Sequence, residues 1–129
     1  MDAAIQIIRT MAPWAGLSLM ALIFLANAIG LVNQSVAVRE LSNTGVPPAS
    51  ARLMVNFGRL VQLLATPCLF FSPTRLYAAI LLAAFMVGAT LAAHAFWKAA
   101  AADRDRQLVN FLKNIAIIGG LLVAAGWSG

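Results

Sequence analysis

The chain has 129 residues, of which 62% are hydrophobic and only 10% are charged, and its formal net charge is +5 at pH 7. Soluble globular domains carry about a quarter of charged residues, so this composition predicts an integral membrane protein. The nine basic residues are scattered without interleaved aromatics, which argues against a nucleic-acid partner, and the single cysteine, Cys68, excludes an intramolecular disulfide.

The first predicted membrane span covers residues 13–32. Arg9 precedes an apolar run, as a basic residue does in a signal peptide. The run is longer than the apolar core of a signal peptide, so we expect a span that is retained in the protein. A short amphipathic lead is expected over residues 1–10. Trp14 suits the membrane interface at one end of the span, and Asn27 is its main internal polar residue. A polar loop is expected over residues 33–46.

Three further spans are predicted at residues 48–71, 76–97 and 108–127. Pro47 and Pro48 fit the first turn of a helix, Pro67 should kink the second span, and residues 72–75 should form a turn. Each run has about the 20 residues that cross a bilayer as a helix. Because the links are short, we predict one all-α domain over residues 1–129, an up-down-up-down four-helix membrane bundle.

The basic residues predict an orientation in a cytoplasmic or inner membrane. The side that carries the first and third loops holds more of them: Arg39, Arg52, Lys98, Arg104 and Arg106, against Arg9 and Arg75 on the other. The positive-inside rule therefore places both termini outside.

Polar side chains on one face of the second span form the first candidate site. Asn56, Arg59, Gln62 and Thr66 follow at spacings of three and four, and the four apolar stretches hold no acid to pair with Arg59. Its guanidinium could snorkel to the headgroups or face the bundle interior, and the polar companions favour the interior.

The ends of the third and fourth spans add further polar residues at the same membrane surface. Thr90 and His94 are four apart, and Asn110, Lys113 and Asn114 share a face. We predict a polar pocket lined by Asn56, Arg59, Gln62, Thr90, His94, Asn110, Lys113 and Asn114, although an ordinary packing network would use similar residues. His94 is the candidate proton donor or acceptor, and as the sole histidine it cannot build a multi-histidine metal site. The run from Asp103 to Arg106 is interpreted as a solvated loop.

The segment Asn110-Phe-Leu-Lys-Asn-Ile-Ala-Ile-Ile-Gly-Gly-Leu-Leu resembles the C-terminal motif of the DoxX family, and His94-Ala-Phe-Trp97 is similar to the end of that family's third helix. The resemblance runs from about Leu17 to Ala125. It implies a four-helix bundle in a bacterial or archaeal cytoplasmic membrane, and only His94, Lys113 and Asn114 match as motif positions. The family's name member is described as a subunit of a thiosulfate:quinone oxidoreductase, and relatives are linked to oxidative-stress and thiol-redox complexes.

One departure from the family weakens the transfer of an enzymatic activity. DoxX-like proteins commonly carry an acid followed by glycines in the second helix, whereas this chain has Gly58-Arg59-Leu-Val-Gln62 there.

Three functions are compatible with the sequence, and the chain is not expected to be an enzyme on its own. The first is an accessory subunit that docks on partner membrane proteins or on further copies of itself. The second is the membrane subunit of a quinone-linked thiosulfate or thiol oxidoreductase, with Arg59 or Lys113 at a quinone carbonyl and His94 moving a proton. The third is a small-anion channel or carrier through Arg59. No cofactor ligands are evident, and quinone or bound lipid are the molecules that the bundle could hold.

Overall fold

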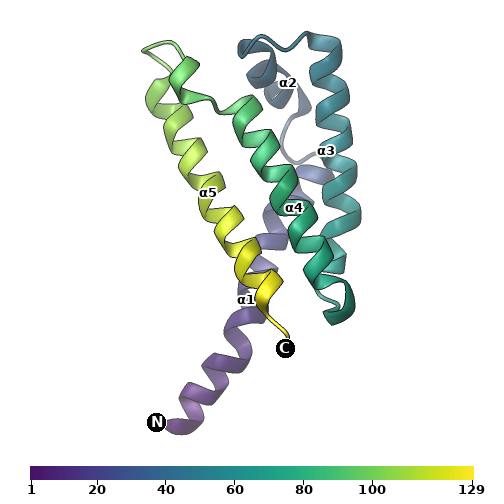
Figure 1. Cartoon of the computed structure of the whole chain (residues 1–129), viewed down its shortest axis with the longest axis vertical. Helices are drawn as coiled ribbons and strands as arrows, with labels where there is room; N and C mark the ends of the chain where they lie inside the picture. Colours follow the sequence, from purple (N-terminus) through teal and green to yellow (C-terminus); the bar gives the residue numbers. More distant parts are fainter.

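The computed structural model describes all 129 residues and contains helices without any strand (Figure 1). The α-helices are α1 (Asp2–Ala28), α2 (Gln34–Asn43), α3 (Pro48–Cys68), α4 (Ser72–Ala93) and α5 (Arg104–Gly126), with a 3₁₀ turn, η1 (Phe96–Lys98), between the last two. The predicted all-α class is confirmed.

Helix α1 is longer than predicted. It runs unbroken from Asp2 through Pro13, so the predicted lead over residues 1–10 is continuous with the helix that contains the first predicted span. The point along α1 at which the membrane begins stays a prediction. Its buried residues, Leu17, Ala21 and Phe24, all lie in the second half, and Figure 1 shows the first half projecting beyond the other helices.

Helix α2 occupies most of residues 33–46, so the prediction of a polar loop there was wrong. Asn33 caps its N-terminus, since the side-chain oxygen accepts from the backbone N–H of Ser35 at 2.9 Å. Gly45 follows its end with a φ of +97°, a conformation that favours glycine. The helix is short and polar, with only Leu41 buried, so it lacks the apolar run that marks a span.

The boundaries of the remaining helices are shifted relative to the predicted spans. Helix α3 starts at Pro48 as expected but ends at Cys68, and α4 already begins at Ser72 because Pro73 fits the first turn of a helix. Interpreting residues 72–75 as a turn was therefore wrong. The third span was predicted to reach residue 97, yet α4 ends at Ala93, and α5 starts four residues before the predicted 108.

The core lies around α4, which packs against both α3 and α5, while α1 packs against α3 and α5. In Figure 1 successive long helices run in opposite directions. Buried α4 residues repeat at helical spacing, and three of the seven are alanines, which allow close helix approach. The central cluster consists of Leu17, Phe24, Ala65, Leu69, Ala78, Ala79, Leu82, Ala83, Met86, Leu121 and Ala124.

Three helical segments are long and apolar enough to cross a membrane: Asp2–Ala28, Ser72–Lys98 and Arg104–Gly126. These candidate spans support a membrane protein. Helix α3 is not among them, because Arg52, Asn56, Arg59 and Gln62 lower its hydropathy. The second predicted span therefore stays a prediction.

Candidate functional site

All five α-helices contribute to one cavity of about 620 Å³, which we call the polar cavity. Its wall is mostly apolar, with side chains such as Phe24, Val36, Met54 and Phe85. Its polar lining residues are Asn27, Glu40, Gln62, His94, Arg106, Asn110 and Asn114. A volume of a few hundred Å³, an apolar wall and a few polar groups are typical of small-molecule sites in proteins.

His94, just after α4, is held by a chain of hydrogen bonds to α5 and α2. Its Nδ1 lies 2.8 Å from Oε1 of Gln107, whose Nε2 donates to Oε2 of Glu40 at 2.5 Å. A carboxylate only accepts, so the amide nitrogen faces Glu40 and the amide oxygen faces the imidazole. This network assigns the ring hydrogen to Nδ1 and leaves Nε2 of His94 as a free acceptor.

Glu40 also ties α2 to α5 through an ion pair. Its Oε1 lies 2.8 Å from Nη1 of Arg106, and the carboxylate side chain is only 13% exposed. Asp103 contacts Nη2 of the same arginine at 3.3 Å. The run from Asp103 to Arg106 was expected to be a solvated loop, but Arg106 lies in α5 and joins the network around the cavity.

The amides of α5 bring unused hydrogen-bonding capacity to the polar cavity. Asn114 donates through Nδ2 to Oγ1 of the buried Thr90 at 3.0 Å, which leaves its Oδ1 without a protein partner. Asn110 is half-buried, and its side chain makes no hydrogen bond to the protein. Together with Nε2 of His94, these atoms can bind a polar ring.

Gln62, on the α1 side of the cavity, has its amide fully engaged. Nδ2 of Asn27 donates to its Oε1 at 2.9 Å, and its Nε2 donates to the Gly58 carbonyl at 3.0 Å. Gln62 is 3% exposed, so this buried pair joins α1 to α3. The predicted interior face of α3 is correct for Gln62, but the contact is structural.

Arg59 does not line the polar cavity, contrary to the predicted pocket. Gly30, with a φ of +86°, closes α1 in a Schellman motif whose N–H groups bond the carbonyls of Asn27 and Ala26. The Ala28 carbonyl is left over, and Nε of Arg59 donates to it at 3.2 Å. The Arg59 cation thus lies at the negative end of the α1 dipole. Its partner is a backbone carbonyl and not an acidic side chain.

Two other predicted pocket residues also lie outside the cavity. Asn56 is exposed and its Oδ1 accepts from Nε2 of Gln34 in α2 at 2.6 Å. Lys113 is exposed and forms no ion pair. Of the predicted pocket, the cavity lining brings together Gln62, His94, Asn110 and Asn114, with Thr90 bonded to the last.

Sequence reasoning missed Gln107 as the partner of His94, and it missed Glu40 and Arg106, which extend the same network. One signal could have found Glu40, because it is the only acidic residue between Asp2 and Asp103 in an apolar chain. A lone acid near the membrane surface needs a partner, and the partners are supplied by the start of α5.

No group of three His, Cys, Asp or Glu side chains lies close enough to hold a metal ion. Comparison of the chain with protein-family models, curated proteins and solved structures finds no match. The resemblance to the DoxX family therefore stays a prediction.

Proposed function

We propose that this chain is a membrane subunit that binds the ring of a quinone-class molecule in the polar cavity. One observation carries the proposal: an apolar cavity of about 620 Å³ whose polar side offers Asn110, Asn114 and Nε2 of His94 with hydrogen-bonding capacity to spare. The amide N–H groups of Asn110 can donate to a quinone carbonyl, and the acceptor atoms Nε2 of His94 and Oδ1 of Asn114 suit the hydroxyls of the reduced quinol. The apolar wall from α1, α3 and α4 suits the ring faces. In this proposal α3 is the fourth membrane-crossing helix of an up-down bundle.

The surrounding residues suit a proton transfer at the bound ring. Reduction of a quinone consumes two electrons and two protons. In the proposed role, His94 takes a proton on Nε2 from water and passes it to a ring oxygen, and it then takes up and delivers the second proton in the same way, while Gln107 holds Nδ1–H in place. Glu40 lies behind Gln107 and stabilises positive charge on the imidazole through that amide. The electrons would come from a partner subunit that oxidises a thiol or thiosulfate, in keeping with the DoxX resemblance.

The test is an isothermal calorimetric titration of the purified protein, held in nanodiscs, with decylubiquinone. Asn110→Leu should weaken binding about tenfold, since one hydrogen bond to the ring is lost. Lys113→Leu, one turn away on α5 and outside the cavity, is the matched control and should change the affinity less than about twofold. Equal effects of the two substitutions, or no saturable binding by the parent protein, would refute the proposal.

A second candidate is an accessory subunit that docks on partner membrane proteins. It is favoured by α5, which buries only Gln107, Leu121 and Ala124 and leaves a long apolar surface uncovered. Purification in mild detergent should then retain a stoichiometric partner that Leu112→Ala with Ile115→Ala releases. A well-behaved monomer, or a partner indifferent to these changes, would count against docking through α5.

A further inference from the structure

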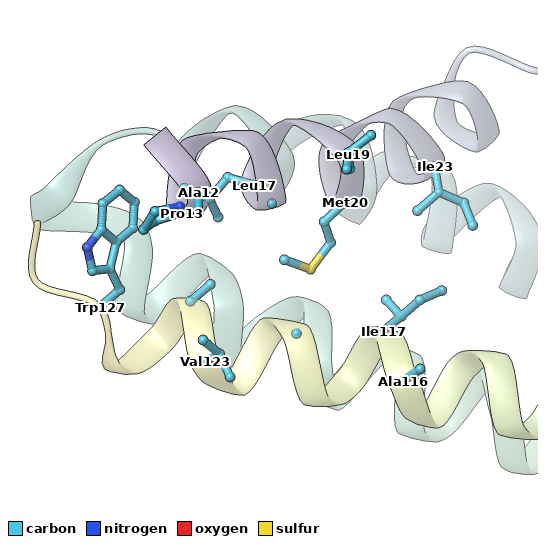
Figure 2. Close-up of a pocket in the computed structure, with 13 residues that line it drawn as sticks. Ala12, Pro13, Leu17, Leu19, Met20, Ile23, Ala116, Ile117, Val123 and Trp127 are labelled. Atoms are coloured by element: carbon cyan, nitrogen blue, oxygen red, sulfur yellow. The ribbon is translucent and has the colours of Figure 1, made fainter. Parts of the chain in front are cut away.

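A second concave surface lies between α1 and α5, and we call it the α1–α5 groove (Figure 2). Its volume is about 760 Å³, and 10 of its 13 lining residues are hydrophobic. The α1 lining extends from Ala12 to Ile23, about 17 Å at the rise of an α-helix. The lining residues are Ala12, Pro13, Gly16, Leu17, Leu19, Met20, Ile23, Ala116, Ile117, Gly120, Val123, Ala124 and Trp127.

Glycines keep this groove open. A Cβ added at Gly16 would meet no atom within 4 Å, and one at Gly120 would meet only the Met20 side chain, at 3.5 Å from its sulfur. Figure 2 shows Met20 reaching across the space toward α5. In a bilayer, an apolar groove of this length between two helices can accommodate a lipid acyl chain.

One end of the groove lies beside the buried guanidinium of Arg75. Trp127 lines that end, and the Cζ atom of Arg75 lies 4.2 Å from the centroid of the Trp127 ring and 5.4 Å from that of Trp14. Arg75 is 2% exposed and lies in the first turn of α4. Its Nε donates to the Leu69 carbonyl, and its Nη1 donates to the carbonyls of Trp127 and Gly129. No carboxylate side chain pairs with it, and Nη2 donates to no protein oxygen.

Arg9 adds a second cation at the same end. It precedes Ala12 by three residues and Pro13 by four, which places it on the groove face of α1, one turn beyond the lining. It is exposed and forms no ion pair. Asp2, the nearest acid along α1, lies about two turns further away.

Tryptophans favour the membrane interface, so Trp14 and Trp127 place this charged end at the headgroups and the rest of the groove toward the membrane interior. We propose that the α1–α5 groove binds one acyl chain of an anionic glycerophospholipid, with the lipid phosphate beside Arg9 and Arg75. The guanidinium fork matches phosphate oxygens, and the apolar lining takes the chain. The groove meets the polar cavity at Ile23 and Ile117, which line both, and its arginines lie at the opposite end.

The experiment uses the full chain with Trp97→Phe, which leaves Trp14 and Trp127 as fluorescent reporters at the groove. The protein is reconstituted in phosphatidylcholine vesicles that contain a fixed fraction of brominated phosphatidylglycerol or, for comparison, brominated phosphatidylcholine. The brominated anionic lipid should quench more strongly, with about fivefold preferential binding for each arginine that contacts its headgroup.

Two substitutions and one control distinguish the site of the acyl chain from the site of the lipid headgroup. Gly16→Leu should fill the groove and abolish the preferential quenching, whereas Gly119→Leu, whose site also has open space but lies outside the lining, should retain it. Arg9→Gln, at an exposed position that tolerates change, should lower the preference for phosphatidylglycerol about fivefold.

Several results would overturn the proposal. Equal quenching of the parent by both brominated lipids excludes an anionic site, and equal behaviour of Gly16→Leu and Gly119→Leu excludes the groove. Cross-linking of two copies through Gly16→Cys would show that a second chain fills it instead. Loss of quenching on addition of decylubiquinone would assign the groove to a quinone tail. If Gly16→Leu does not fold, the Arg9→Gln result alone decides the headgroup contact.

Discussion

Replacement of Glu40 by alanine tests the network that holds His94. The carboxylate accepts from the Gln107 side chain at 2.5 Å and from Arg106 at 2.8 Å. Gln107 is 6% exposed, so its amide would be left buried and unpaired, which costs about 1–3 kcal/mol. The Arg106 side chain is 48% exposed, so loss of its ion pair with Glu40 adds only a few tenths of a kcal/mol to this cost. We expect Glu40→Ala to lower the free energy of unfolding by about 2 kcal/mol.

The assay is reversible unfolding in mixed detergent micelles, followed by circular dichroism, with Asp103→Ala as the control. Asp103 contacts the same arginine but is 55% exposed, so its removal should cost under about 0.5 kcal/mol. A second measurement is the ¹⁵N spectrum of His94, which should show hydrogen on Nδ1 in the parent and a mixture of tautomers after Glu40→Ala. Equal destabilisation by both substitutions, or a parent His94 protonated on Nε2 alone, would show that the network does not act as described.

Two further predictions compare matched pairs of residues in the same unfolding assay. Thr66 is fully buried with an unpaired hydroxyl, so Thr66→Val should raise the free energy of unfolding by about 1 kcal/mol, whereas Thr90→Val, which removes a hydrogen-bond acceptor, should lower it by about 1–2 kcal/mol. Identical signs for the two threonines would contradict the assignment of their hydroxyls. Arg59→Met should cost about 1 kcal/mol through loss of the bond to the end of α1, while Arg52→Met at an exposed position should change stability by under about 0.5 kcal/mol. If Arg59 only snorkelled to the headgroups, Arg59→Met would change the stability as little as Arg52→Met.

Much of the candidate site could be predicted from the sequence, because helical spacing alone groups residues on one face. Gln62, His94, Asn110 and Asn114 were predicted together, and all four line the polar cavity. Lys113 was grouped with them by the same spacing, yet it is exposed. A periodicity of three and four defines a stripe about 100° wide, and the rotation of the helix against its neighbours decides which edge of the stripe is covered.

The long helices of the fold were also predicted from the sequence, but some helix boundaries and one short helix were not. Apolar runs located the long helices, since a run of about 20 apolar residues closes all its backbone hydrogen bonds within itself. Helix α2 and the early start of α4 were missed, because a cap such as Asn33 and a proline at the first turn are signals of a helix boundary and also of a turn.

By itself, the sequence determined that the chain is helical, apolar enough for a membrane, and punctuated by prolines and glycines at helix ends. These properties depend on local backbone chemistry and composition. Only the tertiary structure decided the partners: Glu40 meets Gln107 across 67 positions, Arg59 meets the Ala28 carbonyl across 31, and Arg75 meets Trp127 across 52. Buried polar groups must find partners wherever the packed helices bring them, so the pairing follows from helix docking, which no local pattern encodes.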